Sequence, residues 1–256
     1  MINAIDTHCH VHYGPPDQLE PNPLTDLMTE GSCYTAYPDM LQQISKGAGI
    51  SRVFASPFDG VISSARTEEA NEKMHELACD LPWLYQWVVI DPRNPATFQQ
   101  AERMLKHEKC VGIKLHPVCH HYSLEEYGDK VFAFAQKHSA VVQIHPEKAA
   151  EYLVPFANRY PGAVLIAAHL SSEHHVEAIR QAVHRNLYID TSSMASLKNR
   201  IVEYAVSEIG SDRILFGTDT YSAASQRGRI EFSLLTDPDK ENILLRNAQR
   251  LFQLND

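Results

Sequence analysis

The chain alternates short runs of apolar residues with longer stretches in which apolar residues recur every three or four positions. The apolar runs predict strands at residues 4–11, 52–57, 85–91, 111–116, 141–145, 164–169, 187–191 and 213–218. Several runs are continuously apolar, which is typical of parallel strands that are covered on both faces. The amphipathic stretches predict helices at residues 67–79, 96–107, 124–138, 148–159, 173–185, 196–209 and 239–253.

Eight strands that alternate with helices predict parallel β–α–β units, and this number fits a closed cylinder best. The length of 256 residues is close to the roughly 250 that such barrels typically have. We therefore expect an α/β protein with a single domain over residues 1–256, a (β/α)8 TIM barrel. A doubly wound open sheet is the alternative. Residues 13–38 and 219–237 follow predicted strands, so we expect two long loops over the carboxyl-terminal face, where barrels bind substrates.

Composition narrows the range of partners and compartments. The net charge of −9 argues against a nucleic-acid binder, which usually presents a basic face. The sequence has no run of about 18 apolar residues, so no membrane span is expected. The five cysteines are scattered and form no CxxC pair, which favours reduced thiols and a cytoplasmic location. The chain begins without a basic stretch that leads into an apolar one, so we expect no secretory signal.

The first predicted strand carries two histidines with a spacing of two, His8 and His10. Side chains at i and i+2 of a strand point to the same face, so both imidazoles are expected to project into the barrel. Two imidazoles in this arrangement are ready metal ligands. The motif alone is weak evidence, because a chain with 14 histidines can contain such a pair by chance.

Other predicted strands also end in polar residues. The fifth strand ends in His145 and the sixth in His169, and Asp219 directly follows the eighth. The carboxyl ends of parallel strands meet at one mouth of a barrel, so these side chains are expected to gather there. Burying an unpaired polar group costs about 1–3 kcal/mol, and an unpaired charge costs more. A bound divalent cation removes that cost, so the sequence predicts a metal site at this mouth.

These segments resemble the amidohydrolase superfamily, and within it the amidohydrolase-related group that includes the aminocarboxymuconate-semialdehyde decarboxylase type. The matching pieces are DTHCH at 6–10, GIKLHP at 112–117, QIHPE at 143–147, AHLSS at 168–172, FGTDTY at 216–221 and ILLRNAQRLFQL at 243–254. They span nearly the whole chain in the order of the family.

The resemblance implies roles for individual residues. His8, His10, His145 and Asp219 would bind the metal, with Asp219 also accepting a proton from metal-bound water. His169 would act as acid or base beside one metal ion, or would bind a second ion. Zn²⁺ is the expected cofactor, as one ion or two. The mixed nitrogen and oxygen ligands also permit manganese or iron.

Lys114 lies in the segment in which some relatives carry a carboxylated lysine that bridges two metals. Alternation along the strand predicts that Lys114 and His116 share the inward face. An ammonium 4 Å from a divalent ion would suffer a repulsion of roughly 8 kcal/mol at a dielectric of 20. Lys114 must therefore be carbamylated, be neutral, or lie far enough away to hold a substrate anion, and we favour the last role.

Further residues have weaker roles. His116 is expected to line the pocket or to support a ligand, and Glu147 to support His145. Arg227 and Arg229 are candidates for binding a substrate carboxylate, although a solvated position is an equal alternative.

The expected function is metal-dependent hydrolysis of a small molecule, such as an amide, a lactone, another ester or a cyclic carbon–nitrogen bond. Non-oxidative decarboxylation of a small carboxylic acid is the main alternative. A metal-independent lactonase and a non-catalytic metal-binding barrel are weaker alternatives. The expected partner is a small-molecule substrate, and a homo-oligomer stays open.

Overall fold

The computed structural model describes residues 2–12, 37–146, 150–192, 198–220 and 222–254. Eight parallel strands follow one another around the sheet in chain order. They are β1 (Ala4–Val11), β2 (Ile50–Pro57), β3 (Leu84–Val89), β4 (Cys110–Leu115), β5 (Val141–Ile144), β6 (Val164–Ala167), β7 (Leu187–Asp190) and β8 (Ile214–Leu215).

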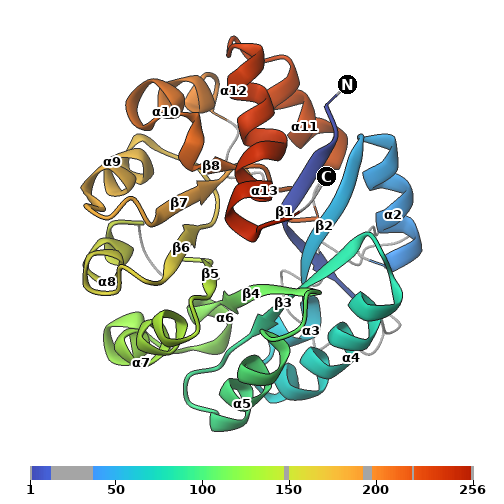
Figure 1. The fold of residues 1–256 in the computed structure, drawn as a ribbon, viewed down its shortest axis with the longest axis vertical. Helices are drawn as coiled ribbons and strands as arrows, with labels where there is room; N and C mark the ends of the chain where they lie inside the picture. Colours follow the sequence, from blue (N-terminus) through green and yellow to red (C-terminus); the bar gives the residue numbers. More distant parts are fainter. Residues whose placement is uncertain (1, 13–36, 147–149, 193–197, 221, 255–256) are drawn as a thin grey trace.

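The sheet closes between its first and last strands. The backbone N–H of Thr7 donates to the carbonyl of Phe216 at 2.9 Å, and the N–H of Thr218 donates to the carbonyl of His8 at 3.1 Å. Figure 1 shows the strands as a ring with helices around its outside. The fold is therefore a (β/α)8 TIM barrel, which confirms the prediction and excludes the open sheet.

Helices follow the strands and form the outer layer. The α-helices are α2 (Pro38–Gly47), α3 (Phe58–Ile62), α4 (Thr67–Asp80), α5 (Pro95–Met104), α6 (Pro117–His120), α7 (Leu124–Lys137), α8 (Val154–Arg159), α9 (Glu173–Gln181), α10 (Ile201–Ile209), α11 (Ala223–Glu231), α12 (Asp237–Glu241) and α13 (Asn247–Phe252). Short helical turns complete the layer at η3 (Ser64–Arg66), η4 (Ala150–Leu153), η6 (Ser211–Arg213) and η7 (Asn242–Arg246), the last a π-helix.

The prediction for residues 219–237 is wrong in one respect, because this segment contains helix α11. The helix buries Gln226 and Arg227 together with Ala223 and Ile230. A helix whose buried face is half polar shows little apolar periodicity, and periodicity is the main signal that a sequence gives for a helix. Of the other long segment, residues 13–36 lie outside the described part of the chain, so the expected loop there stays a prediction.

An irregularity in β1 decides which of its side chains face the interior. The pairing of β1 with β2 shifts register between Asp6 and Cys9. Ile5 packs in the interior cluster and Cys9 in the layer beneath the helices. Strict alternation from Ile5 would turn His8 away from the interior. The extra residue of the bulge lets His8 and His10 face the barrel axis on the same side as Ile5.

The bulge also turns a backbone carbonyl toward the interior. The carbonyl of Thr7 accepts hydrogen bonds from Nε1 of Trp87 and from Nε2 of Gln143, both at 3.0 Å. Trp87 passes close to β4 at Gly112, where a Cβ atom would lie 2.5 Å from the Trp87 ring. These contacts fill the middle of the barrel below the histidines.

Helix α13 closes the amino-terminal end of the barrel. Its Phe252 ring lies 4.9 Å from that of Phe54 and 5.5 Å from that of Trp87, centroid to centroid. Phe54 and Trp87 are fully buried in the interior cluster. Figure 1 shows α13, in red, lying against the ring of strands. Within the described residues, no helix is long and apolar enough to cross a membrane.

Candidate metal centre

His8, His10 and Asp219 meet at the carboxyl-terminal mouth of the barrel. Their potential ligand atoms all lie within 4.8 Å of one another. Oδ1 of Asp219 is 3.0 Å from Nε2 of His10 and 3.4 Å from Nε2 of His8. Imidazole nitrogens and a carboxylate oxygen are ordinary ligands of divalent metals. This donor set therefore fits the metal that the sequence predicts.

Partners on neighbouring strands orient the two imidazoles. Nδ1 of His8 lies 2.9 Å from Oδ2 of Asp190, the last residue of β7. Nδ1 of His10 lies 2.9 Å from the hydroxyl of Ser56 on β2. A ligating histidine usually donates its second N–H to a carboxylate or other acceptor, which fixes the ring and its tautomer. The Asp190 contact fixes the proton of His8 on Nδ1, so the lone pair of His8 lies on Nε2, the side that faces Asp219.

His169, which follows β6, and His145, which follows β5, lie beside this cluster. Nε2 of His169 lies 3.9 Å from Oδ2 of Asp219 and 3.0 Å from Nδ1 of His145. The rings of His169 and His8 stack with centroids 5.0 Å apart. His145 belongs to none of the close three-donor groups found among the described residues. Its contact with His169 puts it beside the site, and its role as a ligand stays a prediction.

Two of these residues adopt a positive φ, which is uncommon for residues other than glycine. The φ angle is 70° at His169 and 57° at Asp219. Alternation from Ile166, which packs in the interior cluster, would turn His169 outward. The left-handed backbone turns its ring inward instead. Such conformations cost about 1–3 kcal/mol and concentrate at functional sites.

Lys114 points into the barrel, as alternation along β4 predicts. It is completely buried. Its Nζ lies 2.7 Å from Nε2 of His8 and 3.1 Å from Oε1 of Gln143. Burial lowers the pKa of Lys114 to about 8. The lysine therefore lies directly beside the proposed ligands, and its role in holding a substrate anion stays a prediction.

The protonation states also suit a metal. Burial and the charge of Lys114 lower the pKa of His8 to about 4, so its imidazole is neutral at pH 7. Burial alone would raise the pKa of Asp219, but the facing imidazole of His169 and the hydrogen bond with His10 hold it well below its ordinary value. The site thus offers neutral imidazoles and an ionised carboxylate, the forms that bind metals.

Sequence reasoning missed Asp190 and Gln143. Asp190 contacts the rings or backbone of two site histidines, since its Oδ1 also accepts the N–H of His169 at 3.1 Å. Gln143 links Lys114 to the Thr7 carbonyl. Both had a readable signal. Asp190 ends an apolar strand as Asp219 does, and Gln143 precedes His145 by two positions on the same face.

The structure does not bring Arg227 to this cluster. Its guanidinium donates to the carbonyls of Gly49 at 2.9 Å and Ile2 at 2.6 Å, which precede β2 and β1 at the other end of the barrel. These carbonyls satisfy a buried cation structurally, so the substrate-binding role expected for Arg227 is wrong. Arg229 donates to Gln226 at 3.0 Å and to the carbonyl of Thr191 at 3.3 Å, and it too has no contact with the cluster.

His116 lies at the edge of the site, and Glu147 lies outside the described residues. The His116 ring stacks on that of His145 at 4.2 Å between centroids. Nδ1 of His116 accepts a hydrogen bond from the N–H of Cys119 at 3.2 Å, so His116 caps the amino-terminal end of the short helix α6. This placement agrees with support of His145, while contact with a substrate stays a prediction.

A model of the amidohydrolase family matches residues 5–254, nearly the full length of the chain. The chain therefore belongs to the amidohydrolase family. No curated relative matches it by sequence.

Solved structures with the same fold include several decarboxylases. A 2,6-dihydroxybenzoate decarboxylase with bound 2,6-dihydroxybenzoate has 15% identity and a TM-score of 0.75 over 99% of this chain and 100% of its own. The 5-carboxyvanillate decarboxylase of Sphingomonas paucimobilis has 15% identity and a TM-score of 0.74 over 100% of both chains. A dihydroxybenzoic acid decarboxylase of Polaromonas sp. JS666, with manganese and 2-nitroresorcinol bound, has 17% identity and a TM-score of 0.75 over 100% of this chain and 98% of its own.

Proposed function

We propose that this chain is a divalent-metal-dependent decarboxylase of a small carboxylic acid. The observation that carries the proposal is the buried cation Lys114 directly beside His8, His10 and Asp219. The structural neighbours that decarboxylate hydroxybenzoates support the same reaction. They favour decarboxylation, the alternative from the sequence, over the hydrolysis that was its first expectation.

The charge balance of the site favours an anionic substrate. With the pKa of Lys114 lowered only to about 8, the ammonium is still mostly protonated at pH 7. A divalent ion held by His8, His10 and Asp219 would add positive charge and act as a Lewis acid toward the oxygen atoms of the substrate. A carboxylate compensates these charges in a buried site, whereas a neutral amide or lactone does not.

The reaction replaces a carboxylate by a proton. The carbon–carbon bond breaks, its electron pair stays on the substrate carbon, carbon dioxide leaves, and the carbon takes a proton. We assign the donor role to His169, because Nε2 of His169 faces Asp219 at 3.9 Å and the hydroxyl of Ser192 holds its Nδ1 at 2.9 Å. Asp219 is too acidic for this role, since its pKa lies well below its ordinary value. His169 regains its proton from solvent.

Two divalent ions are candidates for the site. Zinc is the expectation from the sequence, and manganese is supported by the Polaromonas neighbour, in which it is bound. Two imidazoles and a carboxylate accept either ion. Elemental mass spectrometry on purified protein distinguishes the two, and chelation followed by reloading with each ion tells which restores turnover.

The test of the reaction is release of labelled carbon dioxide. Carboxyl-labelled hydroxybenzoic acids are offered beside amides and lactones of similar size, and the headspace is analysed by mass spectrometry. We expect labelled carbon dioxide from the acids. Cleavage of an amide or lactone without carbon dioxide would replace this proposal with hydrolysis.

The variant Asp219→Asn tests whether the cluster carries the reaction. We expect it to lower turnover by about 10²–10⁴-fold, because it removes a charged ligand that also faces His169. Asp237→Asn, on the outer helix α12, is the control and keeps full turnover. Unchanged turnover in Asp219→Asn would show that the cluster is not the reaction site.

A further inference from the structure

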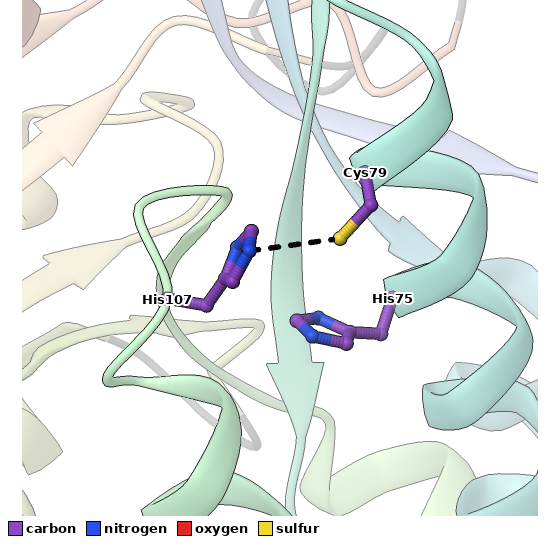
Figure 2. Close-up of side chains that lie close together, drawn as sticks. All are labelled: His75, Cys79 and His107. Atoms are coloured by element: carbon purple, nitrogen blue, oxygen red, sulfur yellow. Dashed lines mark hydrogen bonds between the residues drawn. The ribbon is translucent and has the colours of Figure 1, made fainter.

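A second group of metal-binding side chains lies on the outside of the barrel. His75, Cys79 and His107 place their potential ligand atoms within 4.8 Å of one another. His75 and Cys79 are one turn apart on α4, and His107 is in the segment between α5 and β4. Figure 2 shows the three side chains pointing toward one another above β3. The end of α4 and the start of β4 lie at the amino-terminal end of the barrel, opposite the mouth that holds His8.

We propose that His75, Cys79 and His107 form a separate binding site for a thiophilic divalent cation, with Zn²⁺ as the preferred ion. Sγ of Cys79 lies 3.9 Å from Nε2 of His107. A tetrahedral zinc ion with ordinary bond lengths holds sulfur and nitrogen about 3.6 Å apart. Cys79 and His107 thus need to approach by only a few tenths of an ångström, and the ligand atoms of all three residues lie within 4.8 Å of one another. Exposure of Cys79 and His107 gives the ion a path to the site and water as a fourth ligand.

The surroundings of His75 prepare it for this role. Nδ1 of His75 lies 2.9 Å from Oε1 of Gln86, a fully buried residue of β3. The amide group of Gln86 is itself fixed, because its Nε2 donates to the carbonyl of Asn71 at 2.9 Å. Because Oε1 can only accept, a neutral His75 in this contact carries its proton on Nδ1 and its lone pair on Nε2. This is the outer contact that metal-bound histidines typically make.

The proton balance of binding is simple. The thiol of Cys79 releases one proton to solvent as its thiolate binds the ion. His107 accepts the N–H of Lys109 on Nδ1 at a long 3.2 Å. Binding through Nε2 moves the His107 proton to Nδ1, and water replaces this exposed contact. Nζ of Lys109 is held by the carbonyls of Leu81 and Pro82, each at 2.9 Å.

The donor types separate this site from the one at the mouth. One thiolate and two imidazoles favour zinc, whereas two imidazoles and a carboxylate also suit manganese. Zinc therefore fills both sites, and manganese fills only the mouth. A bound zinc ion would join the end of α4 to the segment that enters β4.

The first experiment uses alkylation of the intact protein by iodoacetamide, with peptide mass spectrometry to follow each cysteine. We expect Zn²⁺ to protect Cys79 at least about tenfold and Mn²⁺ to leave it reactive. Alkylation of Cys79 at the same rate with and without Zn²⁺ would overturn the proposal.

The second experiment uses Co²⁺ as a spectroscopic probe for sulfur ligation. The wild-type protein should show a thiolate-to-cobalt charge-transfer band. Cys79→Ser and His75→Ala should each lower the cobalt affinity read from this band by more than about a hundredfold, which exceeds the cost of losing an outer contact. Cys119→Ser is the matched control, because Cys119 lies beside His116 near the mouth, and it should keep the band. A band that persists in Cys79→Ser, or that needs millimolar cobalt, would show adventitious binding only.

Discussion

Nζ of Lys114 lies 2.7 Å from Nε2 of His8, the nitrogen that also faces Asp219 at 3.4 Å. A protonated lysine donates into the lone pair that a metal ion would use. The ammonium and the metal therefore compete for one nitrogen. This competition ends if Lys114 loses its proton, if Lys114 is carbamylated, or if its side chain rotates toward a bound carboxylate.

Metal binding should therefore depend on pH through Lys114. The pKa of Lys114 in the metal-free protein is about 8. Without a bound carboxylate the metal must displace a proton below that pH, so affinity for Mn²⁺ should rise up to about tenfold per pH unit and level off above it. Lys114→Met should show a weaker rise between pH 7 and 9 in calorimetric titrations. Lys106→Met, on the surface, serves as the control, and equal slopes in all three proteins would refute the competition.

The carbamylated form has its own signature. Intact mass measured under neutral, non-denaturing conditions should reveal one added carbon dioxide if Lys114 is carboxylated, and acid should remove it. Lys114→Met should lack the added mass. A wild-type mass without it at saturating metal and bicarbonate would leave the free amine as the functional form.

Asp190 should tune the metal site without binding the ion. It contacts Nδ1 of His8 at 2.9 Å, so Asp190→Asn should weaken Mn²⁺ binding about 10–100-fold. Ser192→Ala, which removes a hydroxyl 3.0 Å from the same Nδ1, tests the contact with less risk to folding. Asp212→Asn, on the surface, is the control for both. Wild-type affinity in Asp190→Asn and Ser192→Ala would show that neither contact matters.

Gly217 should be needed for the position of His8. A Cβ atom at this position would lie 2.8 Å from Cβ of His8 and 3.0 Å from Cβ of Ser192. Gly217→Ala should therefore lower the free energy of unfolding by about 1–3 kcal/mol and weaken metal binding. Gly47→Ala has no heavy atom within 4 Å of the new Cβ, so it should leave both unchanged or add a little stability. Chemical denaturation measures the difference, and equal curves would contradict it.

Asp91 should make stability depend on acid pH. Burial would raise its pKa, but hydrogen bonds from Arg93 and Ser64 and the charge of Arg93 lower it from 3.8 to about 2. A carboxylate with a depressed pKa stabilises the fold fully above pH 3.8, and the effect is lost as the pH falls through about 2. Asp91→Asn should therefore cost about 1–3 kcal/mol at pH 7, and the difference should vanish near pH 2. A constant difference across that range would count against the ion pair.

The barrel and most of the mouth could be predicted from the sequence because they depend on the periods at which apolar residues recur in strands and in helices. Strands that end in His145, His169 or Asp219 meet at one face by the geometry of parallel strands alone. Asp190 obeys the same rule and shows that it can be applied more fully.

The rest depends on local departures from those periods. The bulge between Asp6 and Cys9 and the positive φ of His169 reverse the side-chain direction that alternation predicts. Neither has a reliable signature in a single sequence. The position of Arg227 could not be predicted either. A guanidinium in a predicted loop is expected to be solvated or to bind substrate, and the sequence does not reveal that its acceptors are the carbonyls of Gly49 and Ile2.

The aromatic seal made by Phe252, Phe54 and Trp87 bears on the path of reactants. Since the cylinder axis is blocked at that end, nothing can pass through the molecule from one side to the other. Whatever enters beside the histidines has to depart through the same opening. Under the proposed reaction, carbon dioxide would therefore leave by the same opening through which the carboxylic acid enters.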